Sequence, residues 1–211
     1  MDRSRMSRSR TILLAAAAIA AGLAVAGFVL RSDLGLGAIG VQGAPPPFRG
    51  DSRPYVEIQP PRALPPLVLE RPDGSPIGIA DLKGRVVVLN LWATWCAPCV
   101  REMPALDRLQ GAFDPRDVTV VALSLDRGGA AQVKPFFAET GIKHLSVYLD
   151  PKMTSMSALK PRGLPTTLVI DREGREVGRL EGAAAWDSPD AHALLRHYLG
   201  TPPATTIRTG G

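Results

Sequence analysis

The chain of 211 residues is poor in cysteine and in histidine, with only two and three of them. Two cysteines, Cys96 and Cys99, are too few for the set of bridges that stabilises small secreted domains. A bridge between them would close a very short loop and remove little entropy from the unfolded chain. A structural zinc site needs four ligands, and the three histidines do not complete such a set. A structural staple and a zinc site are therefore both disfavoured, and we expect no bound metal.

Positive charge is also scarce outside the N-terminal segment. The formal net charge is +5, but five arginines and one aspartate place +4 within residues 1–31, which leaves +1 for the rest. In that larger part, acidic and basic residues alternate, as is typical of a solvated mixed-charge surface. A function in nucleic-acid binding is therefore disfavoured.

Residues 11–30 contain no charged side chain. At about 1.5 Å per helical residue, these twenty residues match the thickness of a bilayer core, about 30 Å. The arginine-rich residues 1–10 precede them, which predicts a cytoplasmic basic segment, a single transmembrane anchor and an exported body. The alternative is a signal segment that is cleaved near Ala26, because Ala24-Val25-Ala26 fits an A-x-A cleavage site.

Three further regions follow the predicted anchor. Residues 31–62 are rich in proline and glycine, which predicts an extended linker, since proline lacks the N–H that helices and central strands need. Residues 63–200 alternate buried strand patterns with helical ones and form the predicted folded domain. Residues 201–211 are polar and end in Gly-Gly, which predicts a disordered tail.

The pattern within the domain predicts an α/β fold with a mixed central sheet and helices on both faces. An N-terminal hairpin and an added strand–helix segment extend the sheet. Strands are predicted at 67–70, 77–79, 85–93, 118–126, 144–150, 166–171 and 176–182, and helices at 100–113, 130–140, 152–160 and 187–200.

Both cysteines stand where a buried strand ends and a helix begins. The N-terminus of a helix carries partial positive charge and free N–H groups, which favour a thiolate. Cys96 would occupy the first turn, where Pro98 is tolerated, and Cys99 would lie one turn further in and deeper. One exposed attacking thiol and one shielded thiol are what disulfide exchange needs. A two-coordinate Cu(I) site on the same thiols stays open as an alternative.

Two segments carry a specific resemblance. "LNLWATWCAPCVREMP" (89–104) resembles the active-site segment of the thioredoxin superfamily, and "RGLPTTLVID" (162–171) resembles its second signature. Within that superfamily the chain is similar to the TlpA-like thiol:disulfide oxidoreductases, which are related to the CcmG/DsbE and ResA types. "EGAAAWDSPDA" (181–191) is similar to TlpA itself. The resemblance implies a thioredoxin-like fold over nearly the whole domain.

The resemblance also implies roles for residues around the cysteines. Cys96 would be the nucleophile and Cys99 the resolving cysteine of a redox-active Cys96–Cys99 disulfide, with no other cofactor. Pro165 would follow a cis peptide bond, and the backbone of Leu164 would pair with an extended substrate segment. Trp95 and Pro98 would contribute substrate-binding surface beside Cys96.

Further residues of the motif have structural or proton-transfer roles in such proteins. Asn90 stands where thioredoxins carry a buried aspartate, and it cannot take a proton. Glu102, three residues after Cys99 on the predicted helix, is the candidate to replace that aspartate as a buried carboxyl of raised pKa. Its other interpretation is an exposed helix carboxylate. Trp92 would pack beneath the helix or belong to the ordinary core, and Pro104 would bend the helix.

The resemblance implies a function in an exported compartment. Ala97-Pro98 between the cysteines lacks the histidine that favours a strong oxidant, which predicts a reductant in the bacterial periplasm, held at the inner membrane. Its clients would be apocytochrome c or factors that assemble the copper centre of cytochrome oxidase. Electrons would come from a membrane reductase of the DsbD/CcdA type. The alternative is a Cu(I)-binding metallochaperone.

Overall fold

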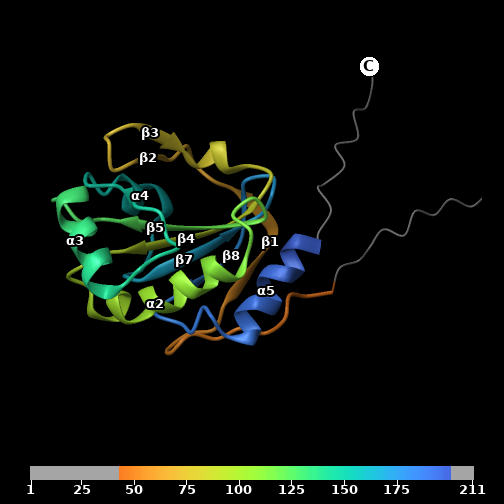
Figure 1. Ribbon diagram of the computed structural model, residues 1–211. Helices are drawn as coiled ribbons and strands as arrows, with labels where there is room; N and C mark the ends of the chain where they lie inside the picture. The colour runs from red at the N-terminus through yellow and green to blue at the C-terminus, as the bar shows by residue number, and fades with distance from the viewer. Residues whose placement is uncertain (1–42, 201–211) are drawn as a thin grey trace, which may run out of the picture. The chain divides into compact units, whose positions relative to one another are not determined.

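The computed structural model describes residues 43–200, which form one eight-stranded sheet with helices against it (Figure 1). The strand order is β1-β8-β7-β4-β5-β6-β2-β3. β4 pairs in parallel with β5 and antiparallel with β7, so the sheet is mixed as predicted. The elements are β1 (Val56–Ala63), β2 (Val68–Glu70), β3 (Pro76–Gly78), η1 (Ile79–Leu82), β4 (Val86–Trp92), α2 (Ala97–Ala112), β5 (Val118–Ser124), α3 (Ala130–Thr140), β6 (Tyr148–Leu149), α4 (Thr154–Leu159), β7 (Thr166–Ile170), β8 (Arg175–Glu181) and α5 (Pro189–Gly200).

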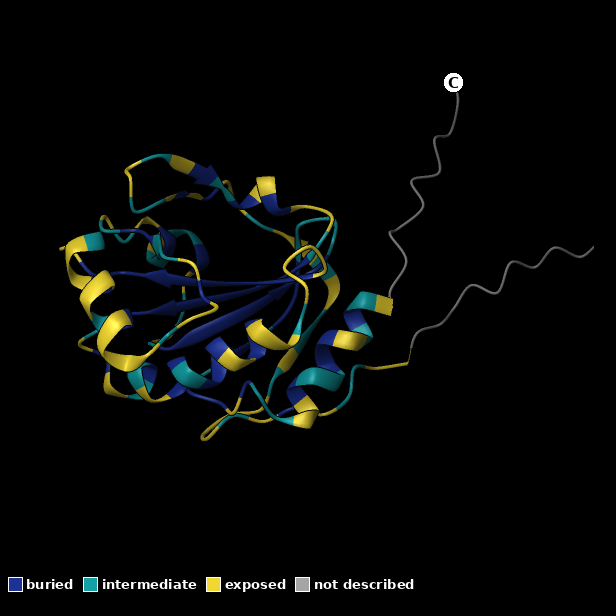
Figure 2. Ribbon diagram, viewed as in Figure 1, coloured by how far each residue is buried: buried dark blue, intermediate teal, exposed yellow. Residues whose placement is uncertain are grey.

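Both faces of the sheet are covered, which explains the continuous apolar sequence of its central strands. Val86 and Val88 of β4 belong to one hydrophobic cluster, together with residues of α2, α3 and α5. Val87, Leu89 and Leu91 belong to a second cluster on the opposite face, with η1, α4 and the β2–β3 hairpin. Figure 2 shows these central strands buried between the two layers. Each fully buried side chain of this size contributes about 1.5–3 kcal/mol.

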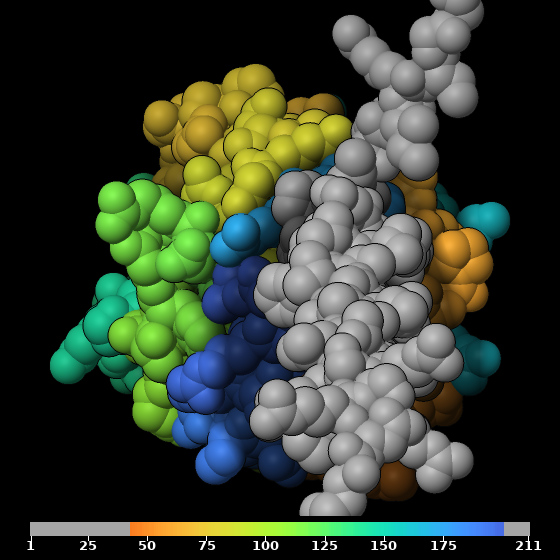
Figure 3. All heavy atoms as spheres, turned by 90° about the vertical axis from the view of Figure 1, so that its right-hand side faces the viewer, coloured from red at the N-terminus to blue at the C-terminus, as the bar shows by residue number. Residues whose placement is uncertain are grey.

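α5 lies beside α2 on one face of the sheet, as Figures 1 and 3 both show. The guanidinium of Arg108 on α2 donates to the carboxylate of Asp187, just before α5, at 2.8 Å. This ion pair links the start of α5 to α2, the helix that follows Cys96. α5 therefore helps to hold α2 on the sheet.

The predicted elements are confirmed with modest shifts of their ends. α2 begins at Ala97, so its first turn contains Pro98 as expected and precedes the stretch 100–113 that the apolar spacing marked. β6 has only two residues, Tyr148–Leu149, whereas 144–150 was expected to be extended. The main-chain N–H groups of residues 143–145 donate instead to the Asp107 carboxylate, which ties that stretch to α2.

The prediction of an extended linker over 31–62 is wrong for its second half. β1 runs from Val56 to Ala63 and pairs antiparallel with β8. Before it, Phe48 is buried against Trp186, with ring centroids 4.9 Å apart, and the Asp51 N–H donates to the Ala183 carbonyl. β1 is an edge strand, so its prolines need no hydrogen-bond partner on the outer side, and the pairing register shifts between Glu57 and Arg62.

The remaining predictions at the ends of the chain lie outside the described residues. They are the basic segment 1–10, the anchor or signal segment 11–30, residues 31–42 of the linker and the tail 201–211. Within residues 43–200, no helix combines the length and the apolar character that crossing a bilayer would require.

Gly178 on β8 allows the N-terminal segment to pack closely. A Cβ atom at this position would lie 2.2 Å from the Tyr55 hydroxyl oxygen and 2.7 Å from the Val56 carbonyl oxygen. The same hydroxyl lies 3.0 Å from that of Tyr198 on α5. We expect Gly178→Ala to lower the free energy of unfolding by about 1–3 kcal/mol, because the backbone of β1 must move away.

Urea denaturation followed by circular dichroism measures this change. Gly43→Ala is the matched control, since its Cβ would meet no atom within 4 Å. A similar loss in both variants would contradict the role assigned to Gly178.

Candidate active site

Both cysteines lie at the junction of β4 and α2, where they form a disulfide with an S–S distance of 2.06 Å. Cys96 directly precedes the first helical residue, and its carbonyl accepts the N–H of Val100 at 3.0 Å. Pro98 occupies the first turn of α2, where its missing N–H is not needed. The free N–H groups and partial positive charge of the helix N-terminus therefore act on Cys96 first.

The two cysteines differ in access to solvent. Cys96 is 7% exposed and Cys99 is 0% exposed. The sequence predicts an exposed Cys96 thiol and a shielded Cys99 thiol. Cys96 is more buried than predicted, but it is the more exposed of the two cysteines, as predicted. Trp95, next to Cys96, is 63% exposed, so it presents apolar surface beside the more accessible sulfur.

Trp92 and Pro104 lie further from solvent. Trp92 is fully buried, and its ring lies 5.1 Å from that of Phe136 and 6.0 Å from that of Phe137 on α3, measured between centroids. The structure therefore favours an ordinary core role for Trp92. Pro104 lies inside α2, and its role in bending the helix stays a prediction.

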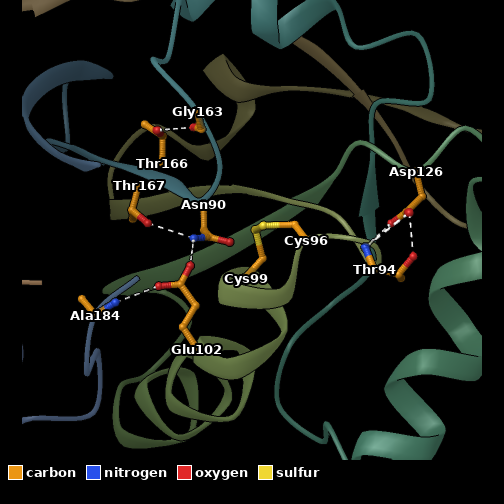
Figure 4. Close-up of a disulfide and its surroundings, with 10 residues drawn as sticks. All are labelled: Asn90, Thr94, Cys96, Cys99, Glu102, Asp126, Gly163, Thr166, Thr167 and Ala184. Carbon is orange, nitrogen blue, oxygen red and sulfur yellow. Dashed lines mark hydrogen bonds between the residues drawn. A yellow bond between two sulfur atoms is a disulfide. The ribbon is translucent and has the colours of Figure 1, made fainter. Parts of the chain in front are cut away.

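Glu102 is buried behind the disulfide, with 3% of its surface exposed, which excludes the exposed-carboxylate interpretation. Its Oε1 accepts the side-chain N–H of Asn90 at 2.8 Å, and its Oε2 accepts the main-chain N–H of Ala184 at 3.1 Å. Figure 4 shows the carboxylate between these two donors, below the Cys96–Cys99 bridge. The site thus joins β4, α2 and the loop after β8.

Burial raises the pKa of the Glu102 carboxyl from its usual 4.5 to about 7. Loss of hydration is the largest cause, and it outweighs the hydrogen bonds from Asn90 and Ala184, which lower the pKa. The Trp186 indole also lowers the pKa of Glu102, by less, although its N–H makes no hydrogen bond within the described residues. Glu102 can therefore gain and lose a proton near neutral pH, which is the property that the sequence predicted for it.

Asn90 links the carboxyl to the neighbouring strand. Its side-chain N–H group donates both to Glu102 and to the Thr167 hydroxyl, the latter at 2.9 Å, because the β4–β7 register sets Asn90 opposite Thr167. Its buried Oδ1 has no hydrogen-bond partner in the described part of the chain. In Figure 4 the Asn90 side chain lies between Glu102 and the disulfide. A reduced Cys99 thiol is a donor of the kind that this oxygen lacks.

Pro165 lies near the same end of the sheet. The Leu164–Pro165 peptide bond is cis, as predicted. The strand register sets Thr166 opposite Leu91, so the loop before β7 stands at the end of β4 from which the cysteine segment begins. Within the described residues, the main chain of Leu164 makes no hydrogen bond, and Leu164 is half-buried. The predicted pairing of this backbone with substrate therefore stays open to test.

One part of the site was missed at the sequence level. The carboxylate of Asp126, fully buried after β5, accepts the N–H and the hydroxyl of Thr94 at 3.0 and 2.7 Å and the hydroxyl of Ser124 at 2.8 Å. It fixes the turn that leads into Trp95 and Cys96. An aspartate at the end of a buried strand was the only available signal.

Comparison with known proteins agrees with this geometry. The sequence profile described as Redoxin matches residues 54–195. The chain belongs to the redoxin family. The thiol-disulfide oxidoreductase ResA of Bacillus anthracis is 34% identical over 121 residues, which cover 57% of this chain and 69% of that protein. ResA of Bacillus subtilis (strain 168) is 36% identical over 118 residues, 56% of this chain and 65% of that protein.

Solved structures show the same relationship. A crystal structure described as a putative thiol:disulfide interchange protein DsbE, from Chlorobium tepidum, has a TM-score of 0.59 and 27% identity, and the match covers 66% of this chain and 97% of that one. This redoxin is a thioredoxin-family thiol:disulfide oxidoreductase, as the resemblance implied. The structure brings together Cys96, Cys99, Glu102 and Asn90, and it sets Pro165 at the same end of the sheet.

Proposed function

We propose that this redoxin is a membrane-tethered reductant of protein disulfides on the exported side of a bacterial inner membrane. The observation that carries the proposal is the arrangement of three residues along one helix. Cys96 directly precedes the helix and is the more exposed cysteine, Cys99 is fully shielded, and Glu102 is a buried carboxyl whose pKa is raised to about 7.

The exchange follows from this order. The thiolate of reduced Cys96 attacks one sulfur of a client disulfide, and the other client sulfur leaves as a thiolate. The Cys99 thiol then loses its proton, attacks the Cys96 sulfur and displaces the second client thiolate. Two electrons pass to the client, its two thiolates take up protons, and the protein keeps the Cys96–Cys99 disulfide. Glu102, three residues after Cys99 on the same helix, would accept the Cys99 proton.

The electrostatics of the site support a reducing rather than an oxidising direction. Cys99 and Glu102 are three residues apart on α2 and therefore neighbours on its surface. A buried carboxylate opposes negative charge on sulfur, which disfavours the thiolate and favours the disulfide form of the protein. Ala97 and Pro98 between the cysteines supply no positive charge to offset it. A protein whose disulfide is favoured gives its electrons away readily.

Equilibration of the full-length protein with glutathione buffers tests this direction. We expect a reduction potential below about −200 mV, on the reducing side of the range that thioredoxin-like proteins span. The fraction of reduced Cys96 and Cys99 is measured by mass spectrometry after alkylation. A potential well above about −200 mV would overturn the assignment as a reductant.

The client and the electron donor are proposed from the TlpA-like resemblance. Apocytochrome c and factors of copper-centre assembly have cysteine pairs that must be reduced before haem or copper is inserted. A membrane reductase of the DsbD/CcdA type would return electrons to the Cys96–Cys99 disulfide. The uncharged residues 11–30 would hold the domain at the membrane, where such partners lie.

A further inference from the structure

A basic groove lies over β1 and β8, next to the loop that carries Pro165. It consists of two adjoining hollows, which share Arg62, Lys160 and Arg179 and enclose about 430 and 520 Å³. Arg53, Arg162 and the acidic Glu181 line the first hollow, and the acidic Glu176 lines the second. This "basic groove" brings together segments from residue 53 to residue 181, so no stretch of the sequence reveals it.

The groove retains positive charge after all its ion pairs are formed. The buried carboxylate of Glu176 is bridged by Arg62 and Arg179. The carboxylate of Glu181 is bridged by Arg53 at 3.4 Å and by Arg162 at 3.7 Å. Each glutamate therefore faces two arginines.

Lys160, which is exposed, has no acidic partner within the described residues. Five cationic side chains against two carboxylates leave a net charge of +3. Glu57, the acidic residue of β1, accepts the side-chain N–H of Gln59 at 2.7 Å and does not line the groove. An anionic ligand would therefore find unpaired donors here.

The groove continues to the Leu164–Pro165 loop of the candidate active site. A third, smaller hollow is lined by Leu164 and Pro165 and shares Arg53, Arg162 and Glu181 with the basic groove. A chain segment that left Cys96 along the Leu164 backbone would thus enter the hollow that Arg53, Arg162 and Glu181 line.

The floor of the groove suits a polypeptide rather than a small anion. Val56 is 55% exposed and lines the groove with Ile58 and Pro54 of the β1 segment. Within residues 43–200, the large hydrophobic side chains that are exposed are Val56, Val68 and Trp95, of which Val56 lies in the groove and Trp95 stands next to Cys96 in the sequence. Apolar contacts along an open, elongated hollow are what an extended segment with acidic side chains would use.

We propose that the basic groove binds an acidic, extended segment of the client protein next to the cysteine that Cys96 attacks. The proposal rests on the proposed function as a disulfide reductase and adds to it a class of substrate. Charge complementarity raises the rate of encounter and sets the direction in which the client lies, whereas the Cys96 chemistry is the same for every client.

The test uses synthetic peptides that share one disulfide and differ only in the flanking residues, which are acidic, neutral or basic. The reduced full-length protein is mixed with each peptide, and the second-order rate constant of reduction is measured. We expect the acidic peptide to react about five- to tenfold faster than the neutral one at about 0.1 M salt, and this preference to shrink at about 1 M salt.

Charge reversal locates the effect. Lys160→Glu with Arg162→Glu is expected to abolish the preference for the acidic peptide. The matched control is Lys83→Glu with Arg116→Glu, the same charge change at exposed positions before β4 and β5, at the opposite end of the sheet from the cysteines. Circular dichroism checks that both variants fold. The control is expected to keep the preference.

The remaining outcomes distinguish failure of the groove proposal from failure of the proposed reductase function. Equal rates for the three peptides would contradict the groove proposal and leave the reductase function intact. The same would follow if both double variants lost the preference for the acidic peptide equally. No reduction of any peptide would sink the proposed function instead. Anionic phosphatidylglycerol vesicles provide the last arm: if reversal weakens vesicle binding but leaves the peptide preference unchanged, the groove faces lipid and the proposal is wrong.

Discussion

Replacement of Cys96 by serine is expected to reduce the rate of client-disulfide reduction to that of the uncatalysed exchange. The accessible sulfur of the pair belongs to Cys96, at the N-terminus of α2, where the thiolate is favoured. Cys99→Ser is expected to stop at the first exchange and to leave Cys96 joined to its client, because nothing then displaces the client sulfur. Insulin reduction by dithiothreitol measures the first effect, and non-reducing electrophoresis with mass spectrometry measures the second.

The two single variants together assign the roles. The double variant Cys96→Ser with Cys99→Ser is the control and should form no adduct. If Cys96→Ser formed the stable adduct and Cys99→Ser did not, the assignment of attacking and resolving cysteine would be reversed. The adduct from Cys99→Ser also identifies the client, since the trapped protein can be sequenced.

Glu102→Gln is expected to slow disulfide reduction about tenfold to a hundredfold near pH 7 and to remove one inflection from its pH profile. The carboxyl has a pKa raised to about 7 by burial, and a general base of matched pKa contributes at least this much to a proton-transfer step. Glutamine keeps the size of the side chain but takes no proton. The rate constant of the reaction of Cys99 is measured from pH 5 to pH 9 in the natural protein and in the variant. An unchanged profile would contradict the relay.

A stability measurement on the disulfide form separates this role from a structural one. The cysteines do not titrate there, so the Glu102 carboxyl can be followed without them. Its pKa is 4.5 in an unfolded chain and about 7 when folded, so the folded state binds more protons between these values. The free energy of unfolding therefore falls as the pH rises from about 4.5 to about 7, by about 3 kcal/mol. Glu102→Gln should lack this fall.

Exposed Glu139 on α3 offers the matched control for both measurements, because Glu139→Gln removes a carboxylate of the same kind in contact with water. Its pH profile and its pH-dependent stability should match those of the natural protein. A Glu139→Gln variant that reproduced the Glu102→Gln result would show that the loss of charge, and not the buried position, is responsible.

The proposed reductase and the basic groove divide recognition from chemistry. The disulfide, Glu102 and Asn90 lie within one buried network, and every client meets the same sulfur. The groove lies on the far side of the Leu164–Pro165 loop and acts on the residues around the client cysteine. Variation in the groove would therefore change which proteins are reduced without changing how they are reduced.

Much of the fold followed from short-range patterns. The apolar run at 85–93 identified β4 because a strand covered on both faces needs no alternation. The position of Cys96 before a helix followed from the strand, the proline and the helical spacing that come after it. The burial of Glu102 and the cis bond before Pro165 were also expected, but through the resemblance and not from spacing.

The linker shows where such patterns fail. Prolines in residues 54–61 argue against a central strand, and they are compatible with an edge strand, yet nothing local distinguishes an edge strand from a solvated spacer. That choice is made by β8, more than a hundred residues later, which offers β1 its hydrogen bonds. Phe48 is buried for the same reason, since its pocket beside Trp186 is built from the far end of the chain.

The sequence by itself determined the strand and helix order, the two thiols at a helix N-terminus and the carboxyl three residues after the second thiol. Spacing along the chain decides which side chains are neighbours on one element, and these features need nothing more. Only the tertiary structure decided that Ala184 and Asn90 enclose Glu102, that Asp126 holds Thr94, and that the arginines gather in the groove. The burial of Glu102 and the net charge of the groove depend on which distant segments meet, and strand pairing across the whole sheet decides that.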